Sequence, residues 1–336
     1  MKTKRMFVGV IVIGLVMAFF AIANIQTADA SAGAIAVETP PFFYKSLFNE
    51  EAINNWQFSN AAVEHKTSPG EPGDDGLVKE EIDTSTTADR KMAFGDSFRL
   101  NNYERPFTAG DMVYHPEIDI LNLIISKDAD FYYFVFELNG VSMDKNYASA
   151  AYGVEIDSDR DGRGDFLLYA QGSSTAWTTE GVMFLQDSNN DVGGSRPVYP
   201  DSGGGDGYDQ IIFSAEVMDD PDAAWMRVDP ANPAKFQLAL KTTLIDKDNF
   251  FWKAFANGGI VDPARFDYND NNIEIQAGSP NTISQFYPVG DLDLLDSTCW
   301  IAYNFRPTGY EPCSCSKPIT PEPKPRKPKL NPVLPT

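Results

Sequence analysis

The sequence has little cysteine, little histidine and, away from its two ends, few basic residues, and these shortages exclude several classes of function. Its 336 residues include 3 cysteines and 2 histidines, and 48 acidic residues outnumber 27 basic ones. Nucleic-acid binding needs clustered Lys and Arg to meet the phosphates, and a formal charge of −21 repels them. We therefore expect no nucleic-acid partner.

Catalytic motifs are missing as well. The sequence has no Gly-x-Ser-x-Gly elbow, and neither His65 nor His115 has a catalytic partner by motif. A glycosidase needs two positioned carboxylates. A chain this acidic contains many acidic pairs, so their presence does not distinguish a glycosidase from a protein without catalytic activity. The sequence predicts no enzyme, and a secreted polysaccharide-active enzyme remains only as an alternative.

Long apolar runs are missing after the N-terminus. Lys2, Lys4 and Arg5 precede an apolar run over residues 6–23, and small residues at 28–30 fit a cleavage site. This pattern is typical of a secretory signal peptide, here residues 1–30, and predicts a secreted protein of the extracellular space or cell surface. The run is also long enough for an uncleaved anchor, and only in that case do we expect contact with a membrane.

The three cysteines lie near the C-terminal end. In an oxidising compartment, Cys299 can form a disulfide with either Cys313 or Cys315, which leaves one thiol over. The sequence does not decide between the two pairings. A metal site built on the three cysteines would lack a fourth ligand nearby.

Short apolar segments bounded by Asp, Asn, Gly or Pro dominate the middle of the chain. In residues 131–138, the even positions form one wholly apolar face, which indicates a strand packed on one side. We expect a mainly β protein, an antiparallel β-sandwich of jelly-roll type, over residues 96–315. Residues 31–95 form a partly ordered N-terminal extension. The predicted strands are 118–125, 131–138, 151–156, 166–170, 182–185, 210–215, 236–244 and 250–256.

The C-terminal residues 316–336 have a different composition. They contain seven prolines and five basic residues, so they cannot pack a core. Such a segment favours extended polyproline II, and we expect a disordered spacer. Its positive charge could contact an anionic cell-wall polymer, or the tail could have no partner.

One acidic segment predicts a calcium site. Side-chain oxygens recur at every second residue of Asp157-Ser-Asp159-Arg-Asp161-Gly162-Arg163-Gly164-Asp165, and a glycine stands where the loop must turn sharply. Ca²⁺ takes about six to eight oxygen ligands at about 2.3–2.6 Å, so a short loop must supply several carboxylates. An acidic turn that binds nothing is the alternative. We predict five ligands in this loop. They are the backbone carbonyl of Arg163 and the side-chain carboxylates of Asp157, Asp159, Asp161 and Asp165.

The flanks of this loop exclude an EF-hand. The twelfth loop position is Leu168 rather than the bidentate glutamate, and the segments on both sides read as strands. Calcium between two strands more often has a structural than a catalytic role. A second segment repeats the spacing with Asp187, Asn189 and Asp191, but Val192 replaces the glycine. We treat it as a possible second metal site.

The five tryptophans suggest a carbohydrate-binding function, because sugar rings expose C–H faces that stack on aromatic planes. Most tryptophans are core residues. Trp177 lies between small and polar residues in a predicted loop or strand end, so it is the best candidate for stacking on a ligand.

The segment from Asp130 to Gly140, followed by Tyr152-Gly-Val-Glu-Ile-Asp157 and the acidic loop, resembles the DOMON and carbohydrate-binding module family 9 sandwiches. Tyr103-Glu-Arg-Pro-Phe107 and residues 177–182 are similar to a group of uncharacterised secreted bacterial proteins. The resemblance implies a ligand-binding or surface role, with sugars or haem as the usual ligands. Haem does not fit, because no Met/His pair with suitable spacing is present.

These features together predict an exported binding module of the cell surface or extracellular space, stabilised by Ca²⁺. Polysaccharide is the ligand class we favour. A structural protein of the cell envelope is the alternative from a different class.

Overall fold

The structure is a computed structural model that describes residues 64–73, 77–80, 102–108, 113–141, 150–192, 206–215, 217, 219–259, 292–308 and 311. All of them belong to one compact unit, Phe43–Thr336. The predicted signal peptide and the predicted proline-rich tail lie outside the described residues.

The described elements are strands, apart from one turn of 3₁₀ helix, η3, at Thr242–Leu244. The first sheet has five antiparallel strands. In spatial order they are β1 (Leu77–Glu80), β3 (Ile120–Lys127), β4 (Phe131–Leu138), β10 (Lys235–Lys241) and β9 (Ala224–Val228).

The second sheet is also antiparallel and is larger. Its spatial order is β2 (Glu104–Arg105), β12 (Leu295–Ser297), β11 (Phe250–Asn257), β5 (Ala151–Asp157), β6 (Phe166–Gln171), β7 (Val182–Gln186) and β8 (Gln210–Phe213); β13 (Ile301–Tyr303) also pairs with β11. In the part of the chain that the structure describes, no helix is long and apolar enough to cross a membrane.

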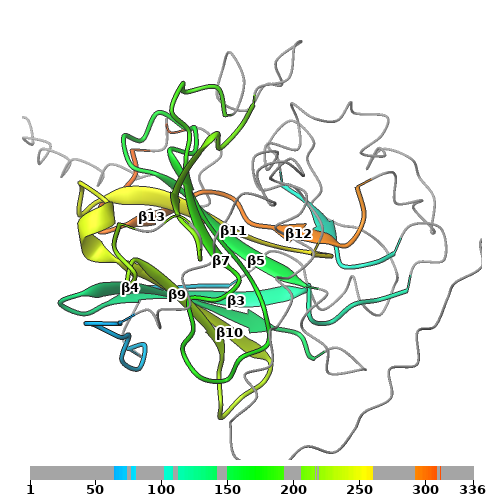
Figure 1. Ribbon diagram of the computed structural model, residues 1–336. Helices are drawn as coiled ribbons and strands as arrows, with labels where there is room; N and C mark the ends of the chain where they lie inside the picture. The colour runs from blue at the N-terminus through cyan, green and yellow to red at the C-terminus, as the bar shows by residue number, and fades with distance from the viewer. Residues whose placement is uncertain are drawn as a thin grey trace, which may run out of the picture. The chain divides into compact units, whose positions relative to one another are not determined.

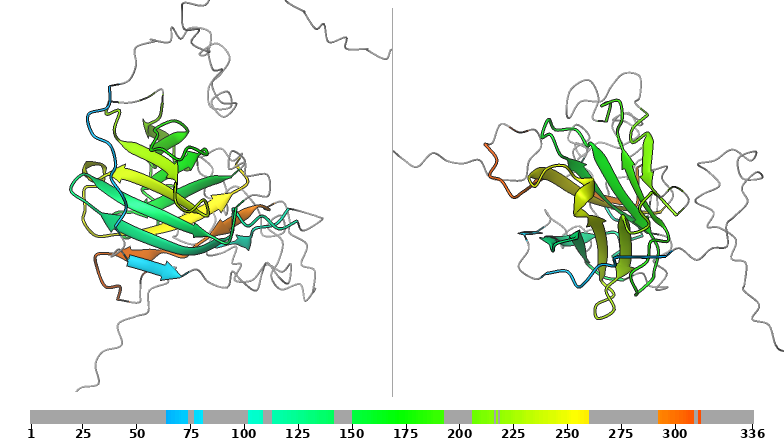
Figure 2. Two further views of the ribbon diagram at one scale, coloured as in Figure 1. Left: turned by 90° about the horizontal axis from the view of Figure 1, so that it is seen from below. Right: turned by 60° about the vertical axis from the view of Figure 1, so that its left-hand side comes forward.

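The two sheets form two layers with the main hydrophobic core between them (Figures 1 and 2). The alternation in β4 explains this arrangement, because Tyr132, Phe134 and Phe136 all join the core. Across the core, Tyr152 of β5 stacks on Phe236 of β10 with ring centroids 4.1 Å apart. The predicted mainly β, antiparallel sandwich is therefore confirmed, and the finer jelly-roll assignment stays a prediction.

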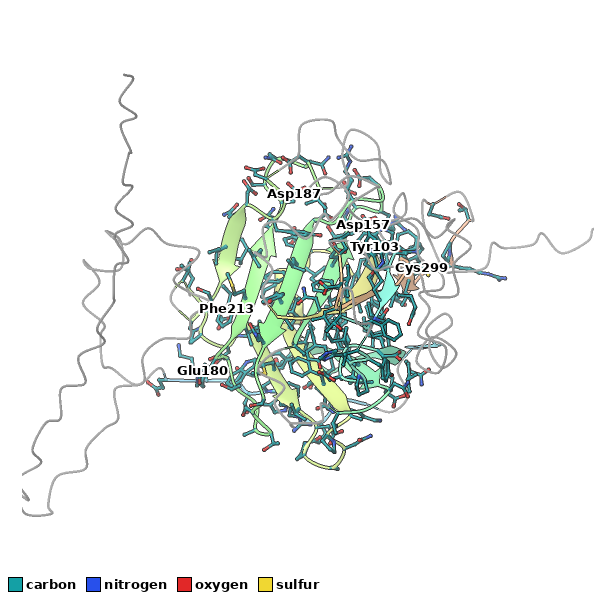
Figure 3. All side chains as sticks on the ribbon, turned by 90° about the vertical axis from the view of Figure 1, so that its right-hand side faces the viewer. Tyr103, Asp157, Glu180, Asp187, Phe213 and Cys299 are labelled. Carbon is teal, nitrogen blue, oxygen red and sulfur yellow. The ribbon has the colours of Figure 1, made fainter. Side chains whose placement is uncertain are left out.

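The order of strands in the second sheet brings two acidic loops together. Strands β5, β6, β7 and β8 follow one another both in sequence and in space, and each pair is antiparallel. In such a meander, the β5–β6 and β7–β8 connections lie at the same end of the sheet, and the β6–β7 connection lies at the other. Figure 3 shows Asp157 and Asp187 at one end and Glu180 at the opposite end.

The predicted strands agree with β3 to β8, β10 and β11 to within a few residues, except that residues 242–244 form η3 instead of continuing β10. Sequence reasoning missed the other strands, which have two to five residues each and carry too short an alternation to recognise. These are β1, β2, β9, β12 and β13. Strand β1 lies within the predicted N-terminal extension, but it pairs with β3 of the sandwich.

Candidate calcium site

The first acidic loop connects β5 to β6. Asp157 is the last residue of β5, and Asp165 directly precedes β6. The loop closes as a hairpin, because the Asp165 N–H donates to the Ile156 carbonyl at 2.8 Å. Both ends of the loop are therefore fixed by the strand pairing.

Asp157 organises the turn from its base. The residue is fully buried, and its two carboxylate oxygens accept the backbone N–H groups of Arg160 and Gly162. Arg160 and Gly162 both have positive φ, 67° and 94°, a conformation that glycine adopts without penalty. The predicted turn at Gly162 is present.

Asp165 closes the loop from the other side. Its Oδ2 accepts the Ser158 N–H at 2.6 Å and the Asp159 N–H at 3.2 Å, in addition to the Ser158 hydroxyl. Asp159 is exposed, and its Oδ1 accepts the N–H of Asp161 at 3.0 Å. Each carboxylate still keeps oxygen lone pairs that a cation can use.

Three of the predicted ligands converge. Asp157, Asp159 and Asp165 each offer a carboxylate oxygen, and these oxygens lie within 4.8 Å of one another. Asp161 is not in this group, and its carboxylate lies 3.9 Å from the guanidinium of Arg163. The Arg163 side chain donates to the carbonyls of the second loop at Asn190 and Val192, at 3.2 and 3.3 Å.

Burial and charge repulsion act on the same carboxylates. Burial, assisted by the negative charges of Asp165 and Asp161, raises the pKa of Asp157 to about 7. Burial also raises the pKa of Asp165, and Asp159 adds to this effect. The folded loop therefore disfavours its own ionised form, and a bound cation would remove this penalty.

The loop rests on a buried polar support. Tyr208 donates its hydroxyl to Glu155 at 2.8 Å, and Glu155 forms a buried ion pair with Lys253 at 2.8 Å. A Cβ atom on Gly164 would lie 1.9 Å from the Tyr208 hydroxyl, so only glycine lets the loop pass this close. Tyr208 comes from the segment before β8, so the two loops share one support.

The second loop repeats the turn of the first. The Oδ1 of Asp187 accepts the Asn190 N–H at 2.7 Å, and its Oδ2 accepts the Val192 N–H at 2.9 Å. These donors stand three and five residues later, as they do for Asp157. Asn190, like Arg160, has positive φ, 62°.

Asp209 is the residue that sequence reasoning missed. It directly precedes β8 and accepts the N–H and the hydroxyl of Ser188 at 2.7 and 2.6 Å, as Asp165 does for Ser158. The only sequence signal is an aspartate immediately before a strand. Hydrogen bonds from Ser188 lower the pKa of Asp209, which is exposed.

The other two predicted ligands of the second loop face Asp206. The Asn189 side-chain amide donates to Asp206 at 2.7 Å, and Asp191 accepts the backbone N–H groups of Asp206 and Gly207. Burial and the contact with Asp206 raise the pKa of Asp191. Among the residues described, Asp187 and Asp191 belong to no group of three converging acidic side chains.

Trp177 lies away from both loops, over the outer face of the first sheet. It packs against Phe131, Tyr133 and Trp225, and the guanidinium of Arg227 lies 4.4 Å from the centre of its ring. The indole N–H donates to the carbonyl of Gly70 at 3.0 Å. Trp177 is half-buried.

Residues 64–73 cover part of this aromatic face. The Gly70 N–H donates to the Tyr133 hydroxyl at 2.8 Å, Glu71 pairs with Arg227, and His65 lies 2.9 Å from Asp222. Residues 64–73 therefore cover part of the surface around Trp177 and reduce the area that is open to a ligand.

The predicted disulfide cannot be followed to its partner. Cys299 is half-buried and lies two residues before β13. Cys313 and Cys315 lie outside the described residues, so the disulfide and its pairing stay predictions.

No family model, no curated protein and no solved structure matches this chain. The function is therefore inferred from the geometry of the two loops and of the Trp177 surface.

Proposed function

We propose that this protein is an exported binding module of the cell surface or extracellular space, built on a β-sandwich that Ca²⁺ stabilises. One observation carries the proposal: Asp157, Asp159 and Asp165 bring three carboxylate oxygens within 4.8 Å in a single hairpin loop. Oxygen donors of this kind suit a hard cation such as Ca²⁺.

The electrostatics support the same metal. The chain carries a formal charge of −21, and the loop concentrates negative charge at a partly buried place. A divalent cation offsets the repulsion and replaces the protons that the raised pKa values favour. Extracellular fluids supply calcium at the concentrations that weak extracellular sites use, about 10⁻⁴ to 10⁻³ M.

The experiment is thermal unfolding of the full chain, first in excess chelator and then in millimolar Ca²⁺, with Mg²⁺ as the control ion. A ligand of the folded state adds about 1.4 kcal/mol at about ten times its dissociation constant, which is about 1 mM Ca²⁺ for a site of about 10⁻⁴ M, and about 2.7 kcal/mol at about 100 times. Asp159→Ala should lose the part of the rise in midpoint that this loop contributes, because the variant lacks one of the three converging carboxylates. The fold itself should hardly change, because Asp159 is exposed. Asp130→Ala is the matched control, since Asp130 is exposed and belongs to neither loop. An unchanged metal affinity in Asp159→Ala would remove this loop as the site.

Polysaccharide is the ligand class we propose, with Trp177 as the stacking residue. The support is Trp177, the half-buried ring that packs on the buried cluster of Phe131, Tyr133 and Trp225 and lies next to the cation of Arg227. Sugar rings stack on such faces, and their hydroxyls hydrogen-bond to nearby charged groups.

Fluorescence titration with a panel of soluble polysaccharides tests this surface. Trp177→Ala should abolish binding, whereas Trp300→Phe, on the second sheet, should leave it unchanged. Equal binding by both variants would place the ligand elsewhere.

A further inference from the structure

Three acidic side chains form a second group, which shares no residue with either loop. Glu104 lies in β2, Asp119 directly precedes β3, and Asp296 lies in β12. Each offers a carboxylate oxygen, and the three oxygens lie within 4.8 Å of one another. The residues are 3%, 0% and 0% exposed, so we call them the buried carboxylate cluster.

Strand pairing explains why these distant positions meet. Asp296 lies directly opposite Glu104 in the antiparallel pair of β12 and β2. The Oδ2 of Asp296 also accepts the N–H of Ile120, the first residue of β3, at 2.7 Å. Because β2 and β12 belong to the second sheet and β3 to the first, the cluster connects the two layers. Like charges directly opposite in a sheet are destabilising unless something neutralises them.

Asp119 is the member that points to a ligand. Its Oδ2 accepts the hydroxyl of Tyr114 at 2.6 Å and the side-chain amide of Asn139 at 3.2 Å. Its Oδ1 is buried and has no hydrogen-bond partner within the described part of the chain. A buried carboxylate oxygen without a donor is unfavourable, so a proton, a water molecule or a metal ion is expected beside it.

The donor set and its spacing decide which ligand fits. All three groups are carboxylates, which suit Ca²⁺ and Mg²⁺ rather than softer metals. Two ligands on opposite sides of one Ca²⁺, each at about 2.4 Å, lie about 4.8 Å apart, so the spacing fits a single ion. Burial raises the pKa of Asp119, so protonation is the competing outcome when no cation is bound.

We propose that the buried carboxylate cluster binds one Ca²⁺ ion, which holds β2 and β12 of the second sheet against the start of β3 in the first. The ion has a structural role and neutralises the facing carboxylates. This site goes beyond the loop site, and the two can succeed or fail separately.

The first experiment leaves the cluster intact. The full chain with Asp159→Asn and Asp209→Asn, which weaken the two loops at exposed positions, is equilibrated with Ca²⁺, dialysed, and analysed by atomic emission. We expect one Ca²⁺ per chain to remain, and Mg²⁺ not to replace it. A chain that retains no Ca²⁺, or that holds Mg²⁺ equally well, would overturn the proposal.

The second experiment changes the cluster within that background. Asp119→Asn keeps the shape and one acceptor but removes the charge, so it should release the remaining ion. Asp130→Asn makes the same chemical change at an exposed position and should release none. Near-ultraviolet circular dichroism confirms folding, and Glu104→Gln replaces Asp119→Asn if that variant does not fold. Retention of the ion in the folded variants would overturn the proposal.

The two sites are distinguished by single variants of the otherwise unchanged chain. If the loop proposal fails, Asp159→Asn alone leaves unchanged the number of ions bound at equilibrium in millimolar Ca²⁺, measured without removal of free Ca²⁺. If the cluster proposal fails, Asp119→Asn alone leaves the number of bound ions unchanged.

Discussion

The loops that follow β5 and β7 fold alike but offer a cation different environments. In each, an aspartate at the end of a strand accepts the N–H groups three and five residues later. In each, a serine after that aspartate donates to a second aspartate that precedes the next strand, Asp165 in one loop and Asp209 in the other. The backbone turn is therefore the same.

The side chains separate the two loops. The first has Asp159 where the second has the neutral Asn189, and its closing carboxylate is half-buried with a raised pKa. The closing carboxylate of the second is exposed, and its pKa is lowered by hydrogen bonds. Hydrogen bonds within the chain can therefore satisfy such a turn without a cation. A strong cation site needs carboxylates that are both crowded and partly desolvated.

The largest effect is expected at the aspartates that organise the turns. In excess chelator, Asp157→Ala should lower the free energy of unfolding by about 2–4 kcal/mol, because two N–H groups lose their acceptor. Asp187→Ala should lose about 1–2 kcal/mol, because its loop is more exposed. Urea unfolding measures both. If the two variants lost equal unfolding free energy, the difference in burial between the two loops would not affect their stability.

The closing carboxylates give the next largest effect and the sharpest contrast. Asp165→Asn should remove most of the gain that Ca²⁺ provides by binding to the first loop, about 2.7 kcal/mol near 100 times the dissociation constant of that site. Asp209→Asn should keep most of the calcium-dependent gain. Asp209 is exposed, and its carboxylate already accepts two hydrogen bonds from Ser188. Calcium titrations followed by thermal unfolding measure both gains. A larger loss in Asp209→Asn would make the second loop the principal site.

The pH dependence tests the charge state of the first loop. The pKa of Asp157 is raised to about 7, so the calcium-free folded state holds a proton that the unfolded state releases near its ordinary pKa. Stability in chelator should therefore fall as pH rises from about 4 to about 7, by at most about 1.4 kcal/mol per unit. Urea unfolding in chelator at intervals across this range measures the slope.

Calcium binding has the opposite pH dependence to this stability, because the ion needs the ionised carboxylate. The affinity should be about thirtyfold weaker at about pH 5.5 than at about pH 8. Asp157→Asn is the control and should remove most of this pH dependence. An affinity that does not change with pH in the unmodified chain would show that Asp157 is not a ligand.

Regular features of the sequence predicted much of the fold. The alternating face of β4 and the short apolar segments between turn residues placed most strands, because side chains alternate in direction along a strand. The two-residue β2 and the three-residue β12 carry no such pattern, and their pairing depends on partners far away in the sequence. Local patterns cannot reveal contacts of that kind.

The residues of the candidate sites also fall into two groups, those that local spacing predicts and those that only the fold brings together. Asp157, Asp159 and Asp165 lie within nine residues, so their spacing alone predicted the first loop. Asp161 had the right spacing, but its carboxylate faces Arg163 and does not join the converging group. Asp209 is separated from Asp187 by a long connection, and no local pattern links the two.

Three features follow from neighbouring residues alone: the strand-rich pattern, the turn at Gly162 and the supply of carboxylates in the acidic loops. Which carboxylates become buried, and which of them meet, depends instead on the folded arrangement of the two sheets. It placed Glu104, Asp119 and Asp296 together and joined the two loops through Arg163. Burial and convergence depend on how the sheets pair and pack, and that packing brings together residues far apart in the chain.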